Sequence, residues 1–429
     1  MNTVNLTHQT TTQSTRVHGP CKINGAIKIA GSKNAALPIL AASILSSQQP
    51  CVLSNIPQLT DTQHILNALM SLGTHVCLTD QDQLAVTPPS QSFTTLNQAI
   101  TKNTRASILF LGPLLTKYKK ANIALPGGCN IGQRPIDQHI NGLEKMGASI
   151  TITDGVVNAT APNGLTGCHI VMPSPASVGG TENIMMAACL AKGTTTITNP
   201  AMEPEVEDLI GFLVSMGAKI QYNNNDQLVI EGQERLIGTH YHIISDRIEA
   251  GTYLIAAAAT QGSIQIKNCN PEHLSTLIHA LQQSGHHILT KDQSVYLRAG
   301  THTRAIDINT APYPGFPTDL QPQWTSLACV SQGVTMVRES LFENRFQHIP
   351  ELVKMGARII HKSNREISIT GNRNLKGIPV QVTDLRAGAA LLIAGMCAKG
   401  TTTLVHSQYL DRGYLHLQEK LAQLGLTIE

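Results

Sequence analysis

A short pattern of hydrophobic and polar positions recurs along the whole chain. Each copy has a leucine, two or three mostly polar residues, a glycine and a short strand-like run. Successive copies lie about 70 residues apart, which is longer than the repeats of the common solenoids and propellers. The six copies occupy residues 69–76, 143–150, 213–220, 281–288, 352–359 and 421–428, and their glycines are Gly73, Gly147, Gly217, Gly285, Gly356 and Gly425.

A second pattern alternates with the first and consists of an Ala/Leu-rich segment, a glycine and a β-branched run. It occupies residues 190–200, 258–268 and 397–407. In both patterns we expect the glycine to end a helix, because glycine adopts the left-handed conformation that closes the last turn without steric cost. The residues that follow favour a strand, so each repeat is predicted to contain strand, helix, strand and helix.

Repeats of this length predict an α/β protein with two globular domains of three repeats each, which suits a chain of 429 residues. Aromatic residues make up only 3% of the chain, so we expect an aliphatic core in which Ala-rich helices are buried and sheets lie outside them. The apolar runs at residues 37–45, 253–259 and 388–398 are too short to span a bilayer and are interpreted as core helices.

Composition excludes several kinds of partner. Charged residues are 14% of the chain and the net charge is +3, so no broad basic face for nucleic acid is expected. The nine cysteines show neither Cys-x-x-Cys pairs nor the Cys/His spacing of a metal site, which favours a reducing cytoplasm. Residues 1–16 lack the apolar segment of a secretory signal and are interpreted as a flexible extension.

The first segment with candidate chemistry is Gly-Ser-Lys-Asn before an Ala/Leu-rich helix. It places Lys33 and Asn34 at a helix N-terminus, where backbone N–H groups and the helix dipole favour an anion. On spacing alone, an equally good interpretation is that Ser32 or Asn34 caps the helix and Lys33 is solvated.

A glycine-rich loop at residues 125–134 precedes a helix that is predicted to begin at Pro135 and to end at Gly147. The loop holds Cys129 and Arg134. A polar loop, a nearby arginine and a helix N-terminus lower the pKa of a thiol, so Cys129 is the candidate reactive cysteine. The alternative is the inert core thiol that most free cysteines are.

Four prolines surround Asp319 in residues 310–323 and predict a backbone that is neither helix nor central strand. A carboxylate on such a rigid segment suits a general base. When the segment is considered alone, however, a turn aspartate that accepts local N–H groups is the favoured interpretation.

Near the C-terminus, Arg386 and Arg412 each stand close to an aspartate at an expected helix entrance. Their planar guanidinium groups suit carboxylate or phosphate, but ion pairs with Asp384 and Asp411 fit the pattern equally well. The same two interpretations apply to the arginines of two further segments, Arg105 and Arg247.

Together these segments resemble the bacterial UDP-N-acetylglucosamine enolpyruvyl transferase family, a branch of the EPSP synthase superfamily. The likeness extends from about residue 19 to residue 428 and follows the order of the family's motifs. These motifs are SKNAALPIL, TRASILFLGPL, LPGGCNIGQRPIDQHI, ASVGGTENIMMAA, EPEVEDLI, DRIEAGTYLIAAA, TAPYPGFPTDLQ, LFENRFQHIPELVKMGA, TDLRAGAAL and DRGYLHL.

The resemblance implies an α/β fold of two inside-out α/β barrels, each with three repeats. It also implies that the chain crosses between the domains twice, near Lys33 and Ser245. We therefore expect one domain of residues 17–33 and 245–429, and a second domain of residues 34–244 that carries the Cys129 loop.

The resemblance further implies roles for single residues. Cys129, Asp319 and Lys33 would be catalytic, and the family's loop cysteine forms a phospholactoyl adduct and reacts with fosfomycin. Phosphoenolpyruvate would bind Lys33, Arg134 and Arg412. UDP-N-acetylglucosamine would contact Asn34, Arg105, Ser177, Val178, Gly179, Asp319 and Leu341. The supporting residues would be Asp246, Arg247, Glu343, Arg345, His348, Asp384 and Arg386.

The implied reaction moves the enolpyruvyl group from phosphoenolpyruvate to the 3′-hydroxyl of UDP-N-acetylglucosamine, an early step of peptidoglycan precursor synthesis. It needs no metal or other cofactor. We expect a cytoplasmic monomer whose partners are these two small molecules, with no nucleic acid and no membrane. The alternatives are transfer to shikimate 3-phosphate, which the Gly-Gly-Cys and Ser-Val-Gly segments disfavour, and a non-catalytic relative that senses a UDP-sugar.

Overall fold

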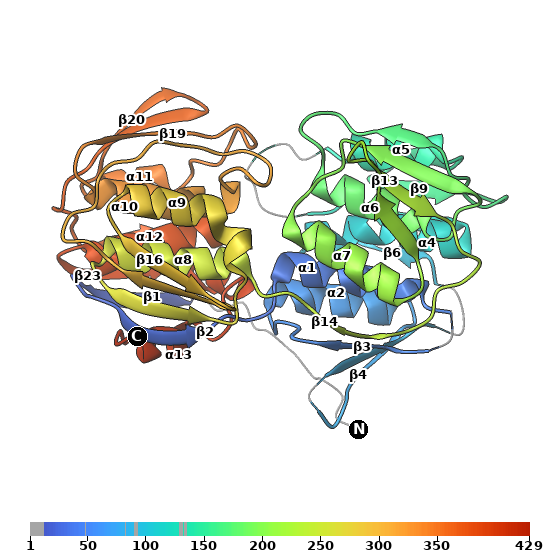
Figure 1. The fold of residues 1–429 in the computed structure, drawn as a ribbon, viewed down its shortest axis with the longest axis horizontal. Coiled ribbons are helices and arrows are strands. Elements are labelled where there is room, and N and C mark those ends of the chain that lie inside the picture. Colours follow the sequence, from blue (N-terminus) through green and yellow to red (C-terminus); the bar gives the residue numbers. More distant parts are fainter. Residues whose placement is uncertain (1–12, 48, 82, 90–92, 128–131, 133–134) are drawn as a thin grey trace. The chain divides into compact units, whose positions relative to one another are not determined.

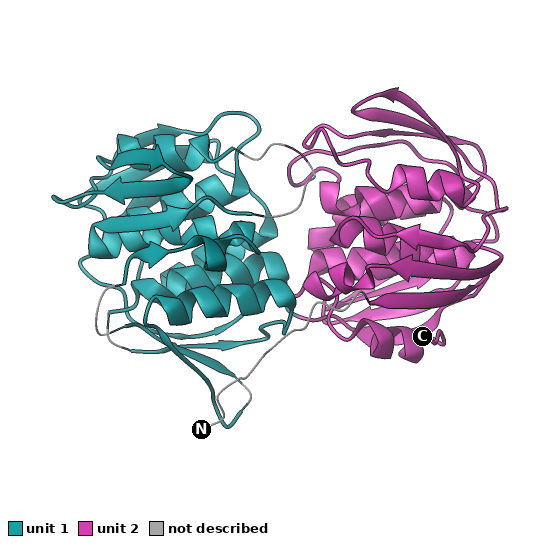
Figure 2. Cartoon of the chain, turned by 180° about the vertical axis from the view of Figure 1, so that it is seen from behind, with its two compact units in different colours: residues 1–5, 31–129, 134–244 teal, residues 6–30, 130–133, 245–429 magenta. Residues whose placement is uncertain are grey.

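The computed structural model describes residues 13–47, 49–81, 83–89, 93–127, 132 and 135–429. These residues form two compact units, each with its own hydrophobic core (Figures 1 and 2). Unit 1 contains residues 31–127 and 135–244, and unit 2 contains residues 13–30, 132 and 245–429. Apart from residue 132, the described chain therefore passes between the units after residue 30 and again after residue 244.

Unit 1 holds three four-stranded sheets of one topology, in which the first two strands are parallel and the other two are antiparallel. In hydrogen-bonded order they are β14 (His240–His242), β3 (Cys51–Ser54), β5 (Leu84–Thr87) and β4 (His75–Leu78); β6 (Thr95–Leu96), β7 (Lys120–Ala124), β9 (Val156–Thr160) and β8 (Ser149–Thr153); β10 (His169–Val171), β11 (Thr194–Thr198), β13 (Leu228–Glu231) and β12 (Lys219–Tyr222).

Unit 2 repeats this topology in two sheets and shortens it in the third. The full sheets are β2 (Asn24–Lys28), β15 (Ser263–Lys267), β17 (Ser294–Arg298) and β16 (His287–Lys291), and β18 (Ile308–Asn309), β19 (Val334–Arg338), β21 (Glu366–Thr370) and β20 (Arg358–Ser363). The third sheet is β22 (Pro379–Gln381), β23 (Gly400–Val405) and β1 (Ser14–Gly19). The strand expected after Gly425 does not form, because Glu429 exchanges only one pair of backbone hydrogen bonds with Arg16.

Six helices, several of them Ala-rich, are buried on nearly all sides, and the sheets lie around them (Figure 1). They are α1 (Lys33–Ala42), α4 (Leu111–Tyr118), α6 (Val178–Ala188), α8 (Arg247–Ala259), α10 (Gln321–Val330) and α12 (Leu385–Cys397). The interpretation of the three apolar runs as core helices is thus confirmed. In the part of the chain that the structure describes, no helix combines the length and hydropathy that crossing a membrane requires.

The helices that end at the repeat glycines expose one face and bury the other. They are α2 (Thr60–Ser71), α5 (Asp137–Lys145), α7 (Pro204–Ser215), α9 (Ser275–Gln283), α11 (Ile349–Lys354) and α13 (Leu417–Gln423). The short helical turns are α3 (Gln98–Thr101), η1 (Ser43–Leu45), η2 (Arg105–Phe110), η3 (Pro271–Leu274), η4 (Thr318–Leu320) and η5 (Ser407–Arg412).

The six repeat glycines all have φ between 83° and 100°, which confirms the predicted left-handed helix ends. One glycine of the second pattern differs. At residues 258–268 Gln261 takes the left-handed conformation, with φ of 56°, and Gly262 does not. Gly262 is needed for another reason, because a Cβ there would lie 2.0 Å from the carbonyl oxygen of Ile23.

Candidate active site

Asp319 lies in η4 of unit 2, and two arginines hold its carboxylate. Arg345 Nη2 is 2.7 Å from Oδ1, and Arg386 Nη2 is 2.8 Å from Oδ2. The side chain of Asp319 is 28% exposed, whereas the two arginine side chains are 3% and 5% exposed. Two cations favour the ionised carboxylate and fix its direction. Asp319 is therefore a fixed negative charge that solvent still reaches.

The backbone around Asp319 is more regular than the prolines predicted. Residues 318–320 form a 3-10 turn, and α10 begins at Gln321. Pro322 lies in the first turn of that helix, where its missing N–H removes no helical hydrogen bond. The prediction of a wholly irregular segment is wrong for this reason.

Arg386 interacts with both Asp319 and Tyr414. Its Nη1 lies 3.3 Å from the Tyr414 hydroxyl, and its guanidinium carbon lies 5.8 Å from the centre of that ring. Burial alone lowers the pKa of Arg386, but the charge of Asp319, with Tyr414 and Asp246, raises it above the usual range. Arg386 consequently remains a cation inside the unit.

Asp384 does not form the side-chain ion pair with Arg386 that was one of the two interpretations. Its carboxylate instead caps α12 and accepts the backbone N–H groups of Arg386 at 2.9 Å and Ala387 at 3.0 Å. The Arg386 guanidinium is directed to Asp319. An aspartate at a helix N-terminus has the unpaired N–H groups of the first turn close by, which explains the difference.

Arg412 ends η5 and is half-buried, and α13 begins only at Leu417. The expected helix entrance at Arg412 is therefore wrong, since the six residues before Gly413 form a short 3-10 helix that ends at Arg412. Asp411 beside it is exposed.

Three supporting residues belong to residues 341–348 of unit 2. Leu341 is half-buried and donates its N–H to Glu339 at 3.0 Å; the other oxygen of Glu339 accepts the Thr318 hydroxyl at 2.9 Å. Glu339 thus ties this segment to the turn that holds Asp319. Glu343 is exposed, with its carboxylate 4.0 Å from Arg365 Nη2.

His348 is buried directly before α11. Within the described residues neither ring nitrogen has a hydrogen-bond partner. Burial lowers the pKa of His348 to about 4; the charge of Asp384 opposes this and that of Arg345 adds to it. The ring is therefore neutral at physiological pH.

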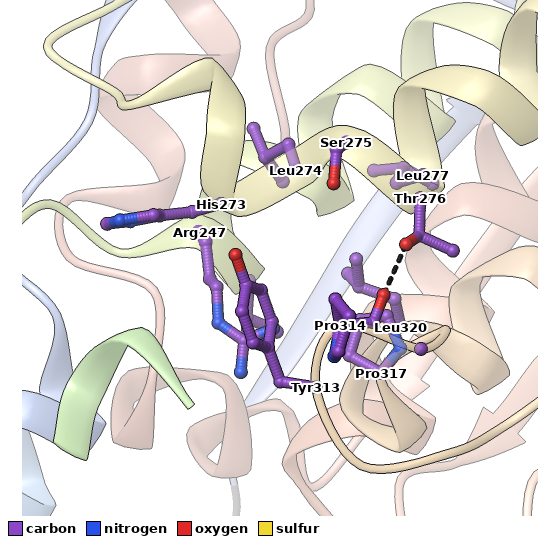
Figure 3. Close-up of a pocket in the computed structure, with 12 residues that line it drawn as sticks. Arg247, His273, Leu274, Ser275, Thr276, Leu277, Tyr313, Pro314, Pro317 and Leu320 are labelled. Carbon is purple, nitrogen blue, oxygen red and sulfur yellow. Dashed lines mark hydrogen bonds between the residues drawn. The ribbon is translucent and has the colours of Figure 1, made fainter. Parts of the chain in front are cut away.

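Asp246 and Arg247 open α8. Asp246 caps the helix, with Oδ1 accepting the N–H groups of Ile248 and Glu249 at 2.8 and 2.9 Å. The guanidinium of Arg247 lies 5.6 Å from the centre of the Tyr313 ring. Arg247 and Tyr313 line a small pocket in unit 2 with residues of η3, α9 and the turn before α10 (Figure 3). Arg247 is the one predicted site residue among the described residues that line it.

Lys33 begins α1 in unit 1. Ser32 caps the helix and accepts the N–H of Ala35 at 3.3 Å, so the capping interpretation is confirmed for Ser32. The interpretation that Lys33 is solvated is wrong, because Lys33 is 8% exposed and its Nζ lies 3.1 Å from Oδ2 of the buried Asp61. Asn34 is half-buried in the first turn.

Ser177, Val178 and Gly179 lie at the start of α6 in unit 1. The Ser177 hydroxyl accepts the N–H of Gly180 at 3.1 Å, and the N–H of Ser177 donates to Gln138 Oε1 at 2.7 Å. The first bond caps α6, and the second joins the start of α6 to α5. All three candidate residues are half-buried, so a ligand can reach this turn.

Arg105 begins η2 and is half-buried. Its charge acts on His139 of α5: burial, and then Arg105, lower the pKa of His139 to about 4, while Asp137 opposes them. A Cβ at Gly179 would lie 3.2 Å from the His139 ring. Unit 1 thus brings Arg105 and the α6 turn to the same buried histidine.

Cys129 and Arg134 lie outside the described residues. The helix after them begins at Asp137, with Ile136 as the residue before it, so the predicted start at Pro135 is wrong by two positions. Ile136 is outside helical geometry, with ψ of 12°.

Sequence reasoning missed Asp61 and Tyr414. Asp61 directly follows the first residue of α2, where an acidic residue suits the helix dipole and gives no sign of pairing with Lys33. Tyr414 stands in the DRGYLHL motif, but its burial against Arg386 depends on the packing of separate helices. No group of three or more His, Cys, Asp or Glu side chains suits a metal ion in the described ranges.

The chain is similar to known proteins over nearly its whole length. The family model for EPSP synthase (3-phosphoshikimate 1-carboxyvinyltransferase) matches residues 17–421. UDP-N-acetylglucosamine 1-carboxyvinyltransferase of Pseudoalteromonas atlantica is 46% identical over 95% of this chain and 97% of its own. The protein of the same name from Hydrogenovibrio crunogenus is 44% identical over 96% and 98%.

Solved structures show the same fold. The enolpyruvyl transferase NikO from Streptomyces tendae is 25% identical with a TM-score of 0.87, over 97% of this chain and 98% of its own. EPSP synthase from Acinetobacter baumannii is 18% identical with a TM-score of 0.76, over 98% and 99%. The protein has the α/β enolpyruvyl transferase fold, and the chain belongs to the EPSP synthase family and, within it, to the UDP-N-acetylglucosamine 1-carboxyvinyltransferases.

Proposed function

We propose that this protein transfers the enolpyruvyl group of phosphoenolpyruvate to the 3′-hydroxyl of UDP-N-acetylglucosamine and releases phosphate, in peptidoglycan precursor synthesis. The observation that carries the proposal is 44–46% identity with UDP-N-acetylglucosamine 1-carboxyvinyltransferases over 95–97% of the chain. The fixed, solvent-accessible carboxylate of Asp319 agrees with it, because the reaction removes a proton from a hydroxyl.

In this proposal Lys33, Arg134 and Arg412 bind phosphoenolpyruvate. The substrate carries up to three negative charges in a small volume, so fixed cations are needed to hold it away from bulk water. Lys33 brings its own counter-ion, Asp61. The incoming phosphate therefore competes with a carboxylate for the ammonium group, and this competition favours the more highly charged ligand.

The sugar nucleotide lies against Asn34, Arg105, the start of α6, Asp319 and Leu341. Asp319 takes the proton of the 3′-hydroxyl while that oxygen attacks C2 of phosphoenolpyruvate. Arg345 and Arg386 stabilise the charge of Asp319 and so make it a weaker base. Such a base cannot remove the proton before the attack, so proton transfer accompanies the attack. Cys129 or another nearby acid gives a proton to C3, and a tetrahedral intermediate results.

Collapse of that intermediate completes the transfer. A base removes a proton from C3, the C2–O bond to phosphate breaks, and the double bond between C2 and C3 is restored. Atoms and charges balance without a redox partner or cofactor. The supporting residues Arg345 and Arg386 hold the base, and Asp384 caps α12, the helix that presents Arg386.

The proposal includes the finer architecture. Each unit would be an inside-out barrel of three repeats, with residues 17–33 and 245–429 in one domain and residues 34–244 in the other. Three sheets of related topology around buried helices in each unit support this arrangement. We propose that the enzyme acts as a cytoplasmic monomer.

Phosphate release tests the reaction. It is measured with both substrates, with each alone, and with shikimate 3-phosphate in place of the sugar nucleotide. We expect release only with phosphoenolpyruvate and UDP-N-acetylglucosamine together. Release with shikimate 3-phosphate alone as acceptor would reverse the assignment, and no release with either acceptor would support a non-catalytic relative.

A pair of variants tests the role of Asp319. Asp319→Asn keeps the size of the side chain but removes the base, and general-base catalysis contributes about 100- to 10,000-fold, so kcat should fall by at least about 100-fold. The matched control is Asp292→Asn, an exposed turn residue of the same unit with φ of 49°, a conformation that asparagine tolerates. Equal kcat values for the two variants would contradict the proposed role.

A further inference from the structure

Tyr414 is a buried residue of unit 2 at the meeting point of three helices. It is 3% exposed. Its hydroxyl lies 3.1 Å from Thr252 Oγ1 on α8, 3.2 Å from Gln323 Nε2 on α10 and 3.3 Å from Arg386 Nη1 on α12. Three polar contacts for one buried phenol are more than is needed to satisfy it.

The directions of these hydrogen bonds follow from the partners. The Thr252 hydroxyl donates its proton to the carbonyl oxygen of Ile248 at 2.8 Å, so it accepts the proton of Tyr414. The lone pairs of Tyr414 are then left for the N–H groups of Arg386 and Gln323. Gln323 Nε2 also lies 3.0 Å from Thr252 Oγ1, so its NH₂ group is shared between the Tyr414 hydroxyl, Thr252 and the main-chain oxygen of Asp319. Burial raises the pKa of Tyr414, and the phenol therefore keeps this proton.

The two residues that donate to the Tyr414 oxygen, Arg386 and Gln323, also form hydrogen bonds with Asp319. Arg386 Nη2 lies 2.8 Å from the Asp319 carboxylate. Gln323 is fully buried, and its Nε2 lies 3.0 Å from the main-chain oxygen of Asp319. One hydroxyl is thus linked to the side chain of Asp319 by one route and to its backbone by the other.

We propose that Tyr414 is a positioning residue of the transfer reaction, whose hydroxyl orients Arg386 and Gln323 so that Asp319 faces the acceptor hydroxyl in the reactive geometry. The inference rests on the proposed function, because it gives Asp319 the role of base. Tyr414 itself touches neither substrate. It also follows Arg412 by two positions, so the same anchor fixes the end of η5, which carries that arginine.

The test compares Tyr414→Phe with Tyr253→Phe. Tyr414→Phe keeps the ring against Arg386 and removes only the hydroxyl. Tyr253 is the matched control, because it is a neighbouring tyrosine of α8, 2% exposed, whose hydroxyl has no hydrogen-bond partner in the described part of the chain. Both variants remove one buried oxygen from the same core.

We expect Tyr414→Phe to lower kcat by about 10- to 100-fold, the effect of misplacing a reacting group by a fraction of an ångström to 1 Å. Because Tyr414 positions the base and not a substrate, the KM values for both substrates should change less than about threefold. The acid limb of the kcat–pH profile should move to higher pH, because a loosely held Arg386 stabilises ionised Asp319 less. Tyr253→Phe should match the wild type in all three readouts.

Equal kcat values for the two variants would overturn the inference, as would a higher KM with unchanged kcat, which would indicate a role in substrate binding. If Tyr414→Phe does not fold, Thr252→Val decides, since it removes the acceptor of the Tyr414 proton and should lower kcat with the same pH shift. The wild-type assay separates failure of the proposed function from failure of the inference about Tyr414. An enzyme inactive with UDP-N-acetylglucosamine refutes the proposed function, whereas an active one with a silent Tyr414→Phe refutes only this inference.

Discussion

Replacing Asp208 with asparagine should stabilise unit 1 at neutral pH and leave its stability at acidic pH unchanged. Asp208 lies on α7 and is 5% exposed. Its carboxylate accepts the Tyr241 hydroxyl at 2.9 Å and the N–H of Ile244 at 3.3 Å. Burial raises the pKa of Asp208 from 3.8 to about 6, although both hydrogen bonds oppose the shift.

The sign of the effect follows from the two pKa values. A carboxyl group with a higher pKa in the folded state stabilises the fold when it is protonated. That contribution is fully present below pH 3.8 and is lost as the pH rises through about 6. The difference between the two values corresponds to about 3 kcal/mol of unfolding free energy.

Asparagine has nearly the same shape and can keep both contacts. Its amide oxygen accepts the N–H of Ile244, and its NH₂ group donates to the Tyr241 oxygen. The Tyr241 proton then remains with the main-chain oxygen of Asp208, which lies 2.9 Å away. Because neutral hydrogen bonds are weaker than those of a carboxylate, we expect a gain of about 1 to 3 kcal/mol at pH 7.5 and less than about 0.5 kcal/mol at pH 4.

Amide hydrogen exchange of α7 is a suitable assay, because the single tryptophan, Trp324, lies in unit 2 and does not report on unit 1. Exchange is compared between wild type and variant at pH 4 and pH 7.5, after correction for the intrinsic rates. Asp226→Asn, at an exposed turn of the same unit, is the control. A variant that is less stable at pH 7.5, or equally shifted at both pH values, would refute the reasoning.

Further predictions concern other buried or strained positions. Lys420→Met removes the ammonium group 2.5 Å from Glu249, which is 1% exposed; we expect a loss of about 3 to 5 kcal/mol in denaturant unfolding and partial recovery when Glu249→Gln is added. Gly217 has φ of 100°, and no atom lies within 4 Å of a Cβ added there, so a substitution strains only the backbone. Gly217→Ala should lower the free energy of unfolding by about 1 to 2 kcal/mol, and Gly217→Asn by less, because asparagine tolerates a positive φ better. Thermal unfolding measures both. Burial lowers the pKa of His286 to about 4, so its NMR titration should show no protonation above pH 5, and the stability that its neutral form contributes above pH 6.5 should be lost as the pH falls towards 4.

Much of the local structure could be predicted from the sequence, since it depends on neighbours along the chain. Each repeat glycine ends a helix because no other residue takes a positive φ as readily, and all six do so. Ser32 caps its helix through a donor three positions away. The apolar Ala-rich runs became buried helices because their sequences offer no polar face.

The candidate site was predictable as a set of residues, but its pairings were not. Sequence spacing offered Asp384 as the negatively charged partner of Arg386, and it gave Lys33 no partner. In the structure, Arg386 pairs with Asp319, 67 positions away, and Lys33 pairs with Asp61, 28 positions away. Neither distance has a helical or strand period that a pattern could reveal.

The amino-acid sequence by itself therefore determined where the repeat helices end, which apolar runs form buried helices, and to which family the motifs belong. Only the tertiary structure decided which charge meets which, and that the Tyr414 hydroxyl joins three helices near Asp319. The physical reason is the separation along the chain between the residues that interact. Turns and caps depend on hydrogen bonds between residues a few positions apart, whereas a buried ion pair exists only after packing has excluded water from two distant segments.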